Sequence, residues 1–271
     1  SNGASQALPT SNTLNVESVF DNIGSATYIS YCFAEVEGFS YFGSYVGNWS
    51  TSGNVVVTGF EPAFVMVKRT DASGNSWLMV DNKRIGTGNE KHELFADSFS
   101  AESGGGYDVA FLENGFQMQT TTSNANASGA SYIYMAFAAD PTTVEPSLED
   151  SFNTVLYTGT GVTNPRTDVG FQPDLVWVKG RSTADNNFLN DSVRGAGYTL
   201  YSNLTSQETL PSADPAISSF DSNGFTLSSS AGVNRSGSTY VAWNWKGAEL
   251  PAINSNGSIP SVVSANPAAG F

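Results

Sequence analysis

The sequence predicts an all-β protein made of two tandem antiparallel β-sandwich units, jelly-roll or lectin-like, of about 100 residues each. Three observations predict this fold: motifs that occur twice, short apolar or alternating runs at sandwich-like spacing, and Asn-Gly pairs between such runs. The segment over residues 92–102 comes nearest to a helical pattern, and we expect at most one turn of helix there.

The first repeated motif is a turn followed by an apolar run. It consists of Gly59, Phe60 and Pro62 in the first copy and of Gly170, Phe171 and Pro173 in the second. Proline fits the first position of a strand, because no ladder donor is needed there. The run that follows is apolar at odd and even positions alike, so we expect a strand that is central or covered by a neighbouring unit.

The second repeated motif is an aspartate followed three residues later by an arginine. The pairs are Asp81 with Arg84 and Asp191 with Arg194. One interpretation makes each aspartate a general base or a ligand-binding carboxylate. The other is a charge-assisted pair that pins a loop, and its presence in both units favours this structural interpretation.

The third motif occurs three times and predicts a closing strand. Tyr28, Tyr132 and Tyr240 each follow an asparagine by six residues and open a run with large side chains on one face, which we expect to point into a core. With the Pro-rich linkers, the motifs predict a closing segment of a preceding unit (1–37), a first sandwich (38–140), a linker (141–149), a second sandwich (150–249), and a linker with the start of a further unit (250–271). We therefore expect an excerpt of a longer array of independent sandwiches, whose uncovered ends self-associate. The alternative is a natural chain with exchanged end strands.

Composition excludes several classes of function. The formal charge of −14 argues against nucleic acid and anionic membranes as partners. The single His92 and the single Cys32 exclude a multi-histidine metal site and an intrachain disulfide, and we expect no cofactor and no catalytic residues. No apolar run approaches the ~18 residues of a membrane span, and the first ten residues lack a signal-peptide core.

Three aromatic residues near the start of the first unit are candidates for carbohydrate stacking. Tyr41, Tyr45 and Trp49 would form a sugar-stacking platform if their rings were exposed side by side. Aromatic residues at strand ends are more often part of a core, and we favour that interpretation.

Taken together, the segments 170–179, 191–195, 219–225 and 239–243 resemble a tandem domain of unknown function in marine bacteriophage virion and tail-fibre-like proteins. The resemblance covers most of residues 20–250. It implies a non-enzymatic virion component (tail fibre, spike or capsid surface) on the particle's exterior, with other virion subunits and copies of itself as partners. The alternatives are a glycan-binding host-recognition module and a surface glycan depolymerase, although no acid–base pair can be located from the sequence.

Overall fold

The computed structural model describes residues 26–53, 55–84, 92–104, 109–138, 151–212, 214–248, 251–256 and 258–271. In these residues the regular secondary structure is almost entirely antiparallel β-strand, as predicted. The helical elements among them are the four-residue α1 (Ala231–Asn234) and the 3-10 turn η2 (Pro267–Ala269). No helix in the described part is long and apolar enough to cross a membrane.

The first unit is a sandwich of a five-stranded sheet, in the order β1-β8-β3-β4-β5, and a three-stranded sheet, β2-β7-β6. Its strands are β1 (Ser40–Val46), β2 (Val55–Val57), β3 (Pro62–Arg69), β4 (Leu78–Asp81), β5 (Leu94–Phe95), β6 (Val109–Leu112), β7 (Gly115–Met118) and β8 (Ser131–Ala138). The pattern near residues 92–102 therefore forms the short strand β5 and no helix, within the expected limit.

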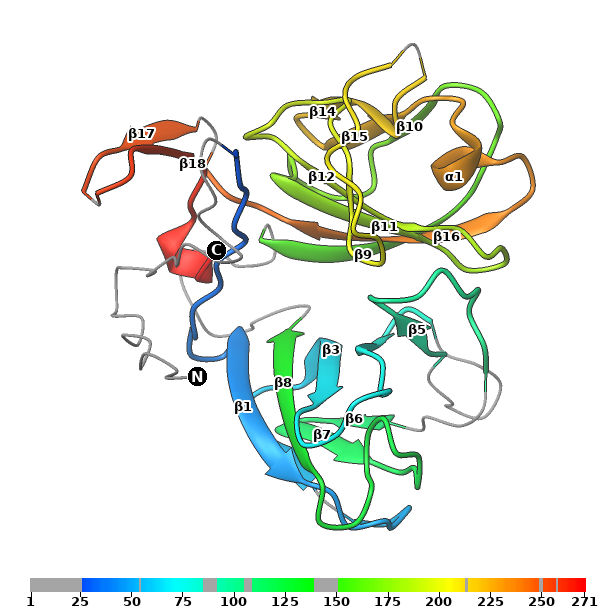
Figure 1. Cartoon of the computed structure of the whole chain (residues 1–271), viewed down its shortest axis with the longest axis vertical. Coiled ribbons are helices and arrows are strands. Elements are labelled where there is room, and N and C mark those ends of the chain that lie inside the picture. The colour runs from blue at the N-terminus through cyan, green and yellow to red at the C-terminus, as the bar shows by residue number, and fades with distance from the viewer. Residues whose placement is uncertain are drawn as a thin grey trace.

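The second unit repeats this topology strand by strand, in the orders β9-β16-β11-β12-β13 and β10-β15-β14. Its strands are β9 (Phe152–Thr158), β10 (Asn164–Arg166), β11 (Leu175–Gly180), β12 (Asn187–Asp191), β13 (Leu200–Tyr201), β14 (Ile217–Asp221), β15 (Gly224–Leu227) and β16 (Thr239–Trp245). The register repeats too: Lys68 lies opposite Ile133, and Lys179 lies opposite Val241. A further hairpin, β17 (Ala252–Asn254) with β18 (Ser261–Val263), lies beside the second unit (Figure 1).

Each Asn-Gly pair lies at the turn of a hairpin, and its glycine is the first residue of the second strand. Only glycine fits at this position. Gly115 and Gly224 open β7 and β15 with a φ of 154°. A Cβ atom at Gly115 would lie 2.0 Å from the carbonyl oxygen of Val56, and one at Gly224 would lie 1.9 Å from that of Arg166. Both hairpins can therefore approach the neighbouring edge strand only with glycine at these positions.

Alternate residues of the large sheets face two different cores. On β16, Tyr240 and Ala242 pack into the core of their own sandwich. Val241, Trp243 and Trp245 join a second cluster that also holds Phe64 and Phe137 of the first unit. The ring centroids of Phe64 and Trp243 are 5.6 Å apart.

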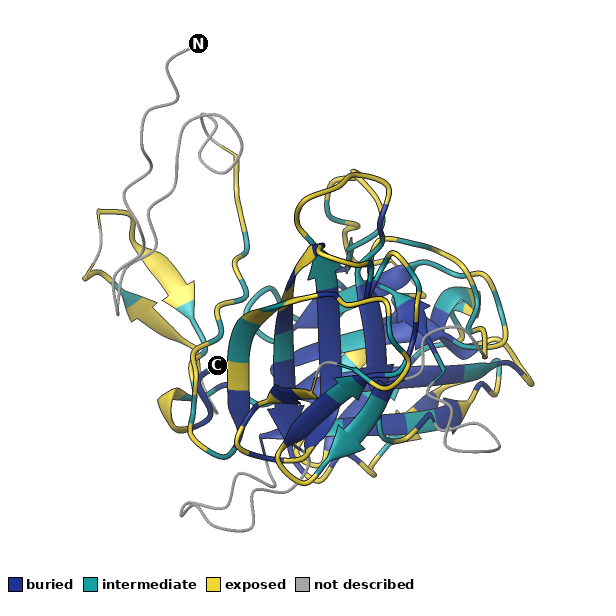
Figure 2. Cartoon of the chain, turned by 90° about the horizontal axis from the view of Figure 1, so that it is seen from below, coloured by how far each residue is buried: buried dark blue, intermediate teal, exposed yellow. Residues whose placement is uncertain are grey.

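The two five-stranded sheets thus face each other across the middle of the molecule, and most of their strands are buried (Figures 1 and 2). The expectation that the two sandwiches pack independently is therefore wrong, because one apolar cluster contains residues of both units. A face that the sequence marks as buried is buried here against the other unit.

The N-terminal segment also departs from the prediction. Residues 26–35 form no strand, and the part of the predicted closing segment before residue 26 lies outside the described residues. Tyr31 and Phe33 pack against the shared cluster, and the ring of Phe33 stacks on Phe271 with centroids 5.1 Å apart. The chain itself covers these aromatic side chains, so the expected self-association through them loses its basis.

Candidate functional site at the junction of the two units

The first Asp-Arg pair is completely buried at the end of β4. Arg84 Nε donates to Asp81 Oδ2 at 2.6 Å, and both side chains are 0% exposed. The backbone N–H of Arg84 donates to Asp81 Oδ1 at 3.0 Å. Arg84 Nη1 reaches Glu102 at 3.2 Å, while Nη2 donates to the carbonyl oxygen of Met79. A buried arginine needs such a set of acceptors, because an unpaired charge is costly inside a protein.

The second unit contributes two residues to this cluster. Trp243 Nε1 donates to Asp81 Oδ2 at 3.0 Å, and the guanidinium carbon of Arg84 lies 5.4 Å from the Trp243 ring centroid. Arg181 makes a bidentate pair with Glu102, at 2.8 Å for both contacts. We call these five residues, Asp81, Arg84, Glu102, Arg181 and Trp243, the junction network. It connects the units through charge-assisted hydrogen bonds, which are stronger than neutral ones.

Glu102 is the electrostatic centre of the junction network. Burial alone would raise the pKa of its carboxyl, but the hydrogen bond from Arg181 and the charge of Arg84 outweigh burial. With a further hydrogen bond from His92, whose Nδ1 lies 2.7 Å from Oε1, the pKa falls to about 2. Glu102 is therefore ionised at neutral pH and shared between two arginines of different units.

The second unit contains the equivalent cluster with a different aromatic donor. Arg194 Nε donates to Asp191 Oδ2 at 2.6 Å, and Arg194 Nη1 donates to Glu208 at 2.8 Å. The hydroxyl of Tyr31 donates to Asp191 Oδ2 at 2.8 Å, where Trp243 serves in the first cluster. Burial and the charge of Asp191 raise the pKa of Tyr31 far above its usual value, so its hydroxyl stays a donor.

Sequence reasoning found the Asp-Arg pairs and missed their other partners. Glu102 and Glu208 lie 208 − 102 = 106 residues apart, the same offset as Leu94 and Leu200 on β5 and β13. This offset was a readable signal. No sequence signal identified Tyr31 and Trp243 as donors, because each lies at least 160 residues from the aspartate that it contacts.

The geometry supports the structural interpretation of the Asp-Arg pairs. Asp81 and Glu102 accept from arginine, backbone or indole donors, so neither carboxylate is poised to take a proton from a substrate. His92 Nδ1 is hydrogen-bonded to the carboxylate of Glu102 and is therefore not free to contact a substrate. Within the described residues, no group of three or more histidine, cysteine, aspartate or glutamate side chains is placed to hold a metal ion.

The comparisons with known proteins identify a family. A model described as Domain of unknown function (DUF7483) matches residues 1–141 and again residues 146–271. The chain belongs to the DUF7483 family. Each matched segment of this DUF7483 chain contains one sandwich, which confirms a tandem domain of unknown function. No curated protein and no solved structure matches the chain.

The remaining candidates of the DUF7483 chain lie apart from the junction network. Gly59 and Gly170 adopt positive φ angles of 89° and 96°, which suit the predicted turn. The following residues of the repeated motif are core or strand-start residues: Phe60 and Phe171 are buried, Pro62 opens β3, and Pro173 precedes β11.

The three aromatic candidates for carbohydrate stacking differ in exposure. Tyr45 stacks on Tyr132 at 5.0 Å and donates its hydroxyl to the carbonyl oxygen of Ala125, so its ring belongs to the core. Tyr41 and Trp49 are exposed, at 39% and 53%. Of the three candidates, Tyr41 and Trp49 are therefore the exposed ones, and Tyr45 is half-buried.

Proposed function

We propose that this DUF7483 chain is a non-enzymatic structural component of a bacteriophage virion, whose two sandwiches act as one rigid block. A tail fibre, a spike or a capsid-surface element would each use such a block as a spacer. The observation that carries the proposal is the junction network, in which Asp81, Arg84 and Glu102 of one unit are bonded to Trp243 and Arg181 of the other.

The energetics of the junction favour a mechanical role. Burying charges costs free energy that only good pairing offsets, so a fully paired buried cluster fixes a geometry more than it adds stability. Fixed geometry is what a spacer needs, since ordinary interdomain contacts leave domains free to move. The facing sheets add an apolar cluster, with Phe64 between Trp243 and Trp245, that resists bending between the units.

The virion setting rests on the resemblance of the repeated segments to phage structural proteins. Other virion subunits and further copies of the chain are the expected partners, on the outside of the particle. The charge of −14 agrees with partners other than nucleic acid.

The mechanical part of the proposal is tested by calorimetry of the intact chain. A rigid block unfolds in one transition whose van't Hoff and calorimetric enthalpies agree. Replacing Arg181 by leucine removes both its contacts with Glu102 and is expected to separate the transitions of the two units. Two separate transitions in the unaltered chain would contradict the rigid block.

The virion part is tested on purified particles. Mass spectrometry should find the chain in density-purified particles, and immunogold electron microscopy should place it on their outer surface. Labelling that stays with soluble protein after particle purification would overturn the assignment.

The exposed rings of Tyr41 and Trp49 favour a second candidate, a glycan-binding module. Trp49 is also the non-glycine residue with a positive φ, 56°, among those described, and such strain often accompanies functional positions. Binding on a glycan array that disappears with Trp49→Ala would support this candidate, and an array without signal would remove it.

A further inference from the structure

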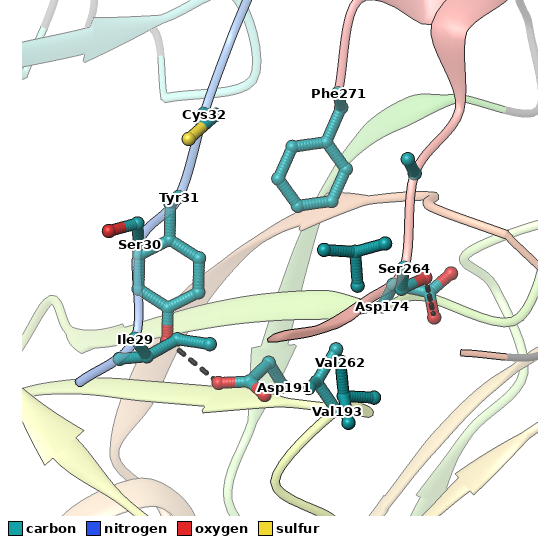
Figure 3. A pocket seen from close by; sticks show the side chains of 12 residues that line it. Ile29, Ser30, Tyr31, Cys32, Asp174, Asp191, Val193, Val262, Ser264 and Phe271 are labelled. Carbon is teal, nitrogen blue, oxygen red and sulfur yellow. Dashed lines mark hydrogen bonds between the residues drawn. The ribbon is translucent and has the colours of Figure 1, made fainter. Parts of the chain in front are cut away.

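A cavity of about 170 Å³ lies between the second unit and the two ends of the described chain (Figure 3). Its wall is mostly apolar, with Tyr31 on the N-terminal side and Phe271 and Val262 on the C-terminal side. The second unit contributes Val193, the carboxylate-bearing Asp174, and Asp191, whose charge is already paired with Arg194. A closed apolar cavity of about 150 Å³ is known to hold a benzene-sized ligand. This cavity therefore has room for a group of several heavy atoms.

The charge of Asp174 has only neutral partners. Asp174 is 4% exposed, and its carboxylate oxygens accept hydrogen bonds from the hydroxyls of Ser192 and Ser264 and from the backbone N–H of Gly247. No lysine or arginine nitrogen of the described residues lies within 4.0 Å of this carboxylate. The serine and glycine donors satisfy the carboxylate oxygens and favour the charged form, while the negative charge has no cation beside it. A cation that enters the cavity is therefore attracted to Asp174.

The repeat shows that the fold does not need a carboxylate at this position. Ala63 is the equivalent residue of the first unit, and its carbonyl oxygen accepts from the N–H of Asn82 at 2.9 Å. The carbonyl oxygen of Asp174 accepts from the N–H of Ser192 at the same distance. The backbone is thus alike in both units, and the carboxylate is an addition of the second.

A second difference between the units lies in the wall of the same cavity. The residue before the repeated arginine is Lys83 in the first unit and Val193 in the second. The second unit therefore carries a carboxylate where the first has a methyl group, and an apolar side chain where the first has a cation. Together these changes make the cavity apolar and anionic.

We propose that this cavity binds an organic cation of the alkylammonium class, whose ammonium group pairs with Asp174. Its methylene chain lies against Val193 and Val262, and the rings of Tyr31 and Phe271 add favourable cation–π contact. Anions are disfavoured by the same carboxylate. A free amine and a lysine side chain of a partner share this chemistry, and the proposal stands independently of the virion assignment.

Calorimetric titration of the full chain tests whether binding depends on the charges of the ligand and of Asp174. n-Butylammonium should bind, while n-butanol, its neutral counterpart of similar size, should bind at least about tenfold more weakly. Asp174→Asn keeps the size of the side chain and should weaken n-butylammonium at least about tenfold. The matched control is Glu113→Gln, which removes the same charge from an exposed position in the first unit and should leave binding unchanged.

A second variant tests whether the cation binds in this cavity, and it keeps Asp174 intact. Val193→Lys introduces the residue of the first unit and supplies a tethered ammonium, so it should abolish n-butylammonium binding and raise the melting temperature. This variant also decides the matter if Asp174→Asn fails to fold.

The two sources of the cation are separated with Nα-acetyl-lysine methylamide. Binding comparable to that of n-butylammonium indicates a lysine side chain, and much weaker binding indicates a free amine. The proposal is overturned if n-butanol binds as tightly as n-butylammonium, if Asp174→Asn or Val193→Lys leaves binding unchanged, or if n-butylammonium does not bind.

Discussion

Replacing Asp81 by alanine removes the central acceptor of the junction network. The substitution leaves Arg84, which is 0% exposed, without its closest carboxylate, and it leaves the indole N–H of Trp243 without an acceptor. Removing one partner of a buried ion pair costs about 3–5 kcal/mol. At about 2–4 °C per kcal/mol for a chain of this size, the melting temperature should fall by about 6–20 °C.

The assay is unfolding by heat and by urea, with circular dichroism as the signal that monitors it. The matched control is Asp71→Ala, since Asp71 pairs with Arg69 at the same 2.6 Å but on the surface. Exposed pairs contribute little, so the control should melt almost like the unaltered chain. The melting temperature of Asp81→Asn, which keeps an acceptor oxygen, should lie between those of Asp81→Ala and Asp71→Ala. Equal melting of the two alanine variants would refute the argument that burial sets the magnitude.

The equivalent pair of the second unit provides an internal scale. Asp191→Ala should also lower stability, because it strands Arg194. The loss should be smaller than for Asp81→Ala, since the side chain of Arg194 is 12% exposed and that of Arg84 is 0% exposed. The reverse order would contradict the argument that the more deeply buried arginine is the costlier one to leave without its aspartate.

Three further substitutions test the partners that connect the units. Trp243→Phe, measured by urea unfolding, should cost about 1.5–3 kcal/mol, because it removes a hydrogen bond to the charged Asp81; an unchanged midpoint would contradict this. Tyr31→Phe should lower the midpoint as well, through the lost hydroxyl contact with Asp191, and should leave far-ultraviolet dichroism unchanged. Glu102→Gln should cost about 1–3 kcal/mol at pH 7. Because the folded pKa of Glu102 is about 2, below the usual 4.5, this stabilisation is complete above pH 4.5 and disappears toward pH 2, so the two melting curves should converge there.

The sequence predicted the fold through repetition and local chemistry. The all-β class, the two similar units and the hairpins at Gly115 and Gly224 all followed from patterns that occur twice. Such features depend on neighbours within one unit, where spacing along the chain determines spacing in the sheet.

The packing of the large sheets was not predictable in the same way. Alternation on β16 shows that the face with Trp243 and Trp245 is buried, and it contains no information about the partner. The partner lies more than 100 residues away in the first unit. The segment at Tyr31 was misleading for a related reason: its motif matches β16, and yet it docks through side chains without joining a sheet.

The candidate site was predictable where it repeats and unpredictable where it does not. Asp191 and Arg194 share their positions with the first pair, while the aromatic donors come from different parts of the chain. Trp243 fills the first cluster from a strand, and the smaller ring of Tyr31 fills the second from an irregular segment beside the cavity. Positions that all units need for folding stay alike between repeats, so a cluster of differences in one place indicates a separate demand.

Three such differences meet at the cavity of the second unit. Asp174 replaces an alanine, Val193 replaces a lysine, and Tyr31 stands where the first cluster has an indole. Chance divergence would scatter changes over the exposed surface, where most substitutions cost little. Three donors satisfy the oxygens of Asp174 but supply no positive charge, and the proposed ligand would supply it. The junction network therefore explains how the two units hold together, and the cavity explains why the second unit departs from the first.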